Sequence, residues 1–119
     1  MAAPAVMVVE DDDCVRELVL EILGGEGFTA VGVGNGEEAL RHLRGEGAHP
    51  ALILLDLMMP VMDGWQFREA QLGDPEISTI PVVVLSAVKD ERVPAERHFS
   101  KPCNLEDLLD TVHEFTGGP

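Results

Sequence analysis

Basic residues are scarce in this sequence. The chain of 119 residues carries 8 Lys and Arg against 22 Asp and Glu, so its formal net charge is −14. A protein that binds nucleic acid unaided needs a basic face to meet the phosphates, and one held on a membrane by charge needs a polybasic segment. The composition therefore argues against direct nucleic-acid binding and against electrostatic attachment to a membrane.

Cysteines and long apolar runs are also lacking. Cys14 and Cys103 are the two cysteines, which are too few for a disulfide framework, and the four histidines share no zinc-ligand spacing. No apolar run approaches the roughly 18–20 residues of a membrane span. The N-terminus has no basic segment ahead of its apolar stretch, which argues against a signal peptide. We expect a cytoplasmic protein that does not enter a membrane.

Short apolar runs alternate with segments of helical period. The run at 51–56 is apolar without alternation, which is typical of a parallel strand covered on both faces. Alternation of strands and helices predicts an α/β sheet with helices on both faces, here in one domain over 1–119 with its core at about 6–115. The expected strands are 6–9, 28–31, 51–56, 81–85 and a short one at 98–101.

Polar residues that cap helices precede the helical segments. Asp12 or Asp13 is expected to cap the first helix, and Asn104 the last. Asn35 is expected to cap the second helix, with Glu38 as its capping-box partner. A further helix is expected at about 65–72, preceded by a turn in which Asp63 is expected to act as a capping residue.

Charged and hydroxyl side chains stand where four of the expected strands end. The first strand is followed by Glu10 and Asp11, the third by Asp56, the fourth by Ser86, and the fifth ends at Lys101. Ligands of open parallel sheets bind beyond the carboxyl ends of the strands. We therefore expect three carboxylates, a hydroxyl and an ammonium group along one edge of the sheet.

This set of groups indicates phosphoryl chemistry. Three carboxylates in one crevice repel each other unless a cation compensates them. Mg²⁺ takes a few protein oxygens and leaves positions for a phosphate, and a lysine supplies a second positive centre. A carboxylate can itself attack phosphorus and form an acyl phosphate. The pattern predicts a phosphoryl acceptor with a carboxylate nucleophile, a metal and a lysine.

Four segments together resemble the receiver domain of bacterial two-component response regulators. The resemblance covers about 6–115 and implies a doubly wound, flavodoxin-like sheet of five parallel strands in the order 2-1-3-4-5. The segments are VVEDD at 8–12, LLDLMMPVMDG at 54–64, LSA at 85–87 and SKP at 100–102.

The resemblance implies a metal site. Asp11 and Asp56 would bind Mg²⁺ (or Mn²⁺) directly, and Glu10 would act through a metal-bound water. The backbone carbonyl of Met58 would be a further ligand.

The resemblance also implies how the phosphate is held. Asp56 would be the phosphorylated residue, Ser86 would hydrogen-bond a phosphoryl oxygen, and Lys101 would pair with the phosphate. Pro60 and Gly64 would shape the adjacent loop. Met58 and Val88 stand at positions that tune phosphate loss in this family, and both are apolar here, so slow hydrolysis is expected.

The implied function is signal transfer. A histidine kinase or phosphotransfer protein would donate the phosphoryl group to Asp56, and phosphorylation would switch a surface for an unidentified downstream protein. Such a domain accepts a phosphate and is not a turnover enzyme. Two alternatives remain: a receiver-like scaffold that docks partners without phosphorylation, and a metal-dependent phosphatase. The phosphatase is weakened because Asp56-Leu-Met lacks the second carboxylate of a DxD motif.

Two departures from the family pattern predict an atypical output region. Lys101 follows Ser86 by 15 positions, and the intervening stretch is highly charged and contains Pro94. A strand takes about 5 residues and each connection about 2–6, so few of these positions remain for a helix. The family's fourth helix should therefore be missing or much shortened. The second departure is His98, which stands where the family usually has Tyr or Phe, with Phe99 beside it.

Overall fold

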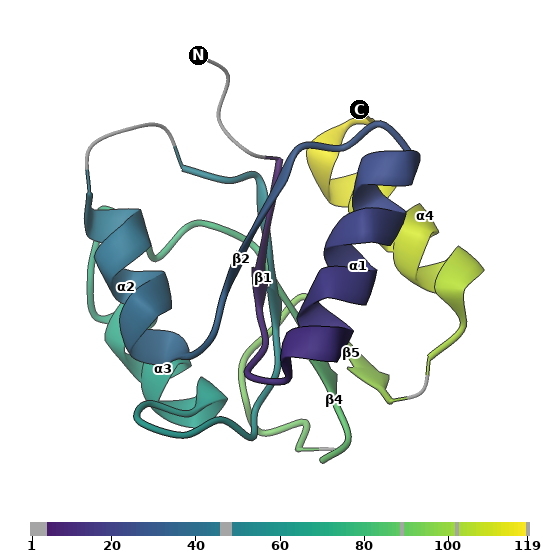
Figure 1. Ribbon diagram of the computed structural model, residues 1–119. Coiled ribbons are helices and arrows are strands. Elements are labelled where there is room, and N and C mark those ends of the chain that lie inside the picture. The colour runs from purple at the N-terminus through teal and green to yellow at the C-terminus, as the bar shows by residue number, and fades with distance from the viewer. Residues whose placement is uncertain (1–4, 46–48, 89, 102, 119) are drawn as a thin grey trace.

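The computed structural model describes residues 5–45, 49–88, 90–101 and 103–118. Five parallel strands form one sheet in the order β2-β1-β3-β4-β5 (Figure 1), so the predicted fold is confirmed. The strands are β1 (Val6–Val9), β2 (Ala30–Val33), β3 (Leu52–Leu55), β4 (Val82–Ser86) and β5 (Arg97–Ser100).

Helices cover both faces of the sheet. Figure 1 shows that α1 and α4 lie on one face of the sheet and that α2 and α3 lie on the other. This arrangement places all five carboxyl strand ends at the edge opposite the two chain termini. The helices are α1 (Asp13–Gly25), α2 (Gly36–Arg44), α3 (Gly64–Leu72) and α4 (Leu105–Thr116).

Two hydrophobic cores explain why the central strands are apolar throughout. Side chains alternate between the two faces of a strand. In β3, Ile53 and Leu55 pack into the core under α2 and α3, whereas Leu52 and Leu54 pack into the core under α1 and α4. All four are buried. A strand covered on both faces leaves no position for a polar residue until it ends, which is where the site begins.

Three helices begin as predicted. The carboxylate of Asp12 accepts from the Val15 amide at 3.1 Å and caps α1. Asn104 caps α4. Asp63 caps α3 and forms a full capping box with Gln66.

The capping box expected at α2 is not formed. The Asn35 side chain does accept from the Glu38 amide at 2.9 Å, so the cap itself is confirmed. The Glu38 carboxylate, however, accepts from the amide of Gly34 at 2.6 Å. Asn35 is fully extended, with φ −165° and ψ 176°, and the Glu38 side chain reaches the amide one residue earlier.

The second strand begins two residues later than expected. The amide of Phe28 donates to the Leu23 carbonyl at 3.0 Å, so this residue still belongs to the exit from α1. Its ring is buried in the core under α1 and α4. Pairing with β1 starts only at Ala30. The apolar character of Phe28 therefore reflects core packing outside the strand.

The β4–β5 connection is irregular. Its described residues, 87–88 and 90–96, form turns and bends and no helix. This agrees with the prediction that the family's fourth helix is missing or shortened, and α4 here is the helix that follows β5. Among the described residues, no helix combines the length and apolar character that crossing a membrane requires.

Candidate functional site

Three carboxylates meet where β1 and β3 end. The amide of Asp56 donates to the Val9 carbonyl at 3.0 Å, which continues the pairing of the two strands by one residue and places Asp56 beside Glu10. One carboxylate oxygen each from Glu10, Asp11 and Asp56 lies within 4.8 Å of the others. Glu10 and Asp56 are buried, and Asp11 is exposed.

Lys101 reaches the same carboxylates from the end of β5. Its backbone amide donates to the Ser86 carbonyl at 3.0 Å, which fixes its position beside β4. The ammonium group forms an ion pair with Glu10, and Nζ lies 3.6 Å from Oδ2 of Asp56. The lysine therefore links two strand ends that are 91 positions apart in the sequence.

Burial and charge shift the pKa values of Glu10 and Lys101. Burial raises the pKa of the Glu10 carboxyl, and the neighbouring charge of Asp56 adds to this, although hydrogen bonds from Lys101 and the Asp12 amide oppose it. Burial alone would lower the pKa of Lys101. The hydrogen bond to Glu10 and the charges of Asp56 and Glu10 outweigh burial, so the Lys101 pKa is raised.

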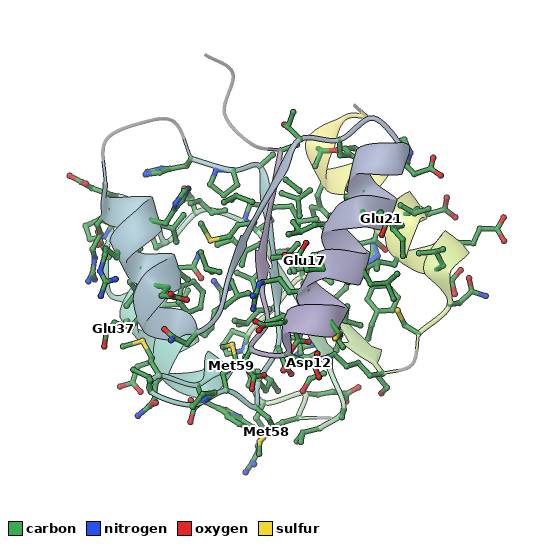
Figure 2. All side chains as sticks on the ribbon, in the orientation of Figure 1. Asp12, Glu17, Glu21, Glu37, Met58 and Met59 are labelled. Carbon is green, nitrogen blue, oxygen red and sulfur yellow. The ribbon has the colours of Figure 1, made fainter. Side chains whose placement is uncertain are left out.

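Ser86 and Met58 lie at this edge but make local contacts. Ser86 is fully buried at the end of β4, and its hydroxyl oxygen accepts from the Val88 amide at 3.2 Å. The amide of Met58 lies 3.4 Å from Oδ1 of Asp56. Figure 2 shows the Met58 side chain at the end of the sheet, directed away from the molecule. Within the part of the chain that the structure describes, neither side chain forms a hydrogen bond with Glu10, Asp56 or Lys101, and both residues stay predictions as site residues.

The loop after Asp56 is folded tightly against the site. The amide of Gly64 donates to the Leu57 carbonyl at 2.9 Å. A Cβ on Gly64 would lie 2.5 Å from the Asp56 carbonyl oxygen and 2.7 Å from Leu57 Cα. These are backbone atoms, so the loop can pass here only with glycine at 64.

Arg16 contacts the site but was not foreseen from the sequence. Its Nη1 donates to the backbone carbonyl of Glu10 at 2.8 Å, and its Nη2 pairs with Asp13 at 2.5 Å. The spacing of Asp13 and Arg16 predicts a pair on one helix face. Nothing in the sequence predicts the bond to a carbonyl six residues earlier.

The residue at the family's aromatic position contacts the irregular connection. The ring nitrogen Nε2 of His98 lies 2.9 Å from the Val93 carbonyl oxygen. Trp65, at the start of α3, packs against the core and also donates from Nε1 to Asp90 at 2.9 Å. The middle of the connection, at Asp90 and Val93, is therefore held by side chains from α3 and β5.

The donor set fits a hard divalent cation. Carboxylate oxygens are the ligands that Mg²⁺ and Mn²⁺ favour. Glu10, Asp11 and Asp56 are three acidic groups, and Lys101 is the basic group paired with two of them. A cation would reduce the repulsion between carboxylates of which two are buried.

Residues 6–113 match the family model of the response regulator receiver domain. The chain belongs to the receiver domain family of two-component response regulators. The receiver is similar to the polar-differentiation response regulator DivK of Brucella ovis, with 28% identity over 95% of this chain and 96% of that protein.

Solved structures agree with this assignment. The receiver is similar to the phosphorylated cyanobacterial phytochrome response regulator RcpA, with 32% identity and a TM-score of 0.79 over 97% of this chain and 94% of that chain. It is also similar to the Mn²⁺-bound form of response regulator Rcp1, with 28% identity and a TM-score of 0.73 over 94% of this chain and 91% of that chain.

Proposed function

We propose that this receiver accepts a phosphoryl group on Asp56 from a histidine kinase or phosphotransfer protein. The observation that carries the proposal is the convergence of Glu10, Asp11, Asp56 and Lys101 at one edge of the sheet. Glu10, Asp11 and Asp56 would hold Mg²⁺ or Mn²⁺, with the Met58 carbonyl as a further ligand. RcpA, a phosphorylated protein, and Rcp1, a Mn²⁺-bound one, support this assignment by similarity.

The transfer is a displacement at phosphorus. A carboxylate oxygen of Asp56 forms the new bond to phosphorus, while the bond from phosphorus to the donor histidine nitrogen breaks and its electrons stay on that nitrogen. Lys101, whose Nζ lies 3.6 Å from Asp56 Oδ2, is placed to neutralise a phosphoryl oxygen. A bound divalent cation supplies further neutralisation of the phosphoryl charge.

Ser86 connects this chemistry to the output surface. Its hydroxyl accepts from the Val88 amide, so a hydroxyl that turned to a phosphoryl oxygen would give up that bond and release the start of the β4–β5 connection. We propose that this connection, which replaces the family's fourth helix, is an atypical output surface. The partner would be a downstream protein, and the domain would act as a cytoplasmic switch, not as a turnover enzyme.

Intact-mass spectrometry tests the proposal. Incubation with acetyl phosphate and Mg²⁺ should add one phosphoryl group to the wild-type chain, and Asp56→Asn should abolish the adduct. Asp12→Asn is the matched control. It removes an adjacent acidic charge, and asparagine caps the first turn of α1 equally well.

The alternative is a scaffold that docks partners without phosphorylation. It is favoured by His98 at the aromatic position and by the irregular connection. A folded wild-type chain that gains no phosphoryl group from acetyl phosphate or from candidate kinases would reject our proposal and favour the scaffold.

A further inference from the structure

The Arg16 side chain lies between the edge strand β2 and the acidic turn at 10–13, which follows β1. Only 19% of this side chain is exposed. A Cβ on Gly32 of β2 would lie 2.9 Å from Arg16 Cδ, 3.0 Å from Arg16 Cγ and 2.8 Å from Leu20 Cδ1, so the stem of the arginine lies against that glycine beside Leu20. An arginine held this closely has lost the freedom of a solvent-exposed side chain.

The guanidinium joins both ends of the acidic turn. Nη1 donates to the carbonyl of Glu10, where the turn begins, and Nη2 pairs with Asp13, where α1 begins. The backbone amide of Arg16 also donates to the Asp12 carbonyl at 2.9 Å. The side chain of Arg16 therefore bonds to both ends of the turn that carries Glu10 and Asp11, although Arg16 is not one of the proposed metal ligands.

We propose that Arg16 is a positioning residue for the divalent-cation site. It holds the turn in the conformation that directs Glu10 and Asp11 toward Asp56, and Gly32 leaves the space in which its stem lies. This inference rests on the metal site proposed above. Arg16 acts through its bond to the Glu10 carbonyl and does not touch the cation.

Charge and positioning predict opposite results when Arg16 is removed. A fixed positive charge near the site repels a cation, so its loss by itself would tighten Mg²⁺ binding. Loss of positioning would weaken binding, because the two carboxylates would no longer be held together. The sign of the change in Mg²⁺ affinity therefore separates the two roles.

The experiment is a calorimetric titration of the full chain with Mg²⁺ alone. Arg16→Met should weaken Mg²⁺ binding about tenfold, in the range found when groups that orient metal ligands are removed. Arg41→Met is the matched control. Arg16 and Arg41 both line a surface cleft beside α1 and β2, but the guanidinium of Arg41 pairs with Glu37 on α2. This control should leave the affinity unchanged or slightly tighter.

Gly32→Ala provides a second route to the same effect without changing any charge. The added Cβ should displace both the Arg16 stem and the end of the Leu20 side chain, and through Arg16 it should weaken Mg²⁺ binding in the wild-type background. In the Arg16→Met background it should weaken binding no further. A full additional loss there would show that Gly32 acts independently of Arg16 and would reject the link between them.

The outcomes separate this inference from the proposed function. If the wild-type chain binds no Mg²⁺, the proposed metal site itself is wrong. If the wild type binds and Arg16→Met binds equally well or more tightly while folded, only the positioning role is rejected. Urea unfolding without metal monitors the fold of each variant. Should Arg16→Met not fold, wild-type affinity in Gly32→Ala overturns the inference.

Discussion

The path of the backbone next to Asp56 requires a residue without a side chain at position 64. The missing side chain of Gly64 leaves room for the Asp56 carbonyl and for Leu57, and both approach as backbone atoms that cannot rotate aside. A flexible side chain could move from such a contact, but a strand end held in the sheet cannot.

We predict that Gly64→Ala destabilises the fold and impairs the site together. Contacts of 2.5 and 2.7 Å must be relieved by moving the loop away from β3, which we expect to lower the free energy of unfolding by about 2 kcal/mol or more. Phosphorylation by acetyl phosphate should also fall. Urea unfolding and intact-mass spectrometry measure the two effects.

Gly24→Ala is the control for this substitution. A Cβ on Gly24 meets nothing within 4 Å, and alanine favours the helix in which Gly24 lies. We expect unchanged phosphorylation and equal or slightly higher stability. Equal behaviour of Gly64→Ala and Gly24→Ala would show that the loop can move at little cost.

Single residues also mark where sequence reasoning succeeds and fails. Glu10, Asp56 and Lys101 could be placed together because parallel strands bring their carboxyl ends to one edge. The local bond of Ser86 to the Val88 amide and the reach of Arg16 to the Glu10 carbonyl could not. Both depend on backbone groups whose direction follows from the folded turn and not from residue type.

At the scale of elements, a buried polar group joins α3 to the irregular connection. The guanidinium of Arg68 donates from Nε to the Pro94 carbonyl at 2.6 Å and from Nη1 to Gln71 at 2.8 Å. The Gln71 amide in turn donates to the carbonyls of Ile77 and Ile80. Burial lowers the pKa of Arg68, although the charge of Glu96 opposes this shift.

We predict that Arg68→Met lowers the free energy of unfolding by about 1–3 kcal/mol. The substitution leaves the side-chain oxygen of the buried Gln71 without its donor, which costs about this much. It also removes the donor of the Pro94 carbonyl, but Pro94 is exposed, so water can take the place of that bond. Amide hydrogen exchange should rise first in the connection, because Arg68 fixes it to α3. Urea unfolding gives the magnitude.

Arg92→Met serves as the comparison for Arg68→Met. Arg92 lies on the same connection, but 91% of its side chain is exposed and it pairs with Asp90. Removing an exposed pair should change stability by less than about 1 kcal/mol. If Arg68→Met is no more destabilising than Arg92→Met, the connection is held by other contacts.

The strands and helices were largely predictable from the sequence, but the hydrogen bonds that connect them to the loops were not. Apolar runs located the strands, and the length of the stretch before Lys101 predicted a connection too short for a full helix, in agreement with the turns and bends of its described residues, 87–88 and 90–96. The Arg68–Gln71 pair had no signal, because its acceptors at Ile77, Ile80 and Pro94 are backbone carbonyls from separate parts of the chain. The capping box predicted at α2 was wrong for a similar reason. The Glu38 carboxylate accepts from the Gly34 amide, whose direction is set by the folded backbone.

At the scale of the whole molecule, the charge of −14 has two distinct parts. Glu10, Asp11 and Asp56 form the concentrated part at one sheet edge. The other acidic residues that the structure describes are dispersed over the surface. Figure 2 shows three of them, Glu17 and Glu21 on α1 and Glu37 on α2, and all three are exposed. The dispersed acids repel one another over long distances, whereas the concentrated ones form the proposed site of one cation.

These two parts predict two separable effects of cations on stability. NaCl should stabilise the wild type by screening the dispersed acids, since charges farther apart than about 10 Å are largely screened at 0.1 M. MgCl₂ at the same ionic strength should stabilise it further. A ligand bound only by the folded state adds about 2.7 kcal/mol at a concentration of 100 Kd.

Asp56→Asn should remove the additional Mg²⁺ increment and leave the NaCl effect, because it changes one ligand of the concentrated set and one charge in the total. Asp12→Asn changes the total charge equally but lies outside that set, so it should retain both effects. Urea unfolding in the two salts measures the increments for each chain. If the Mg²⁺ increment survives in Asp56→Asn at its wild-type size, the ion binds to the dispersed acids, and the three carboxylates at the strand ends do not form its site.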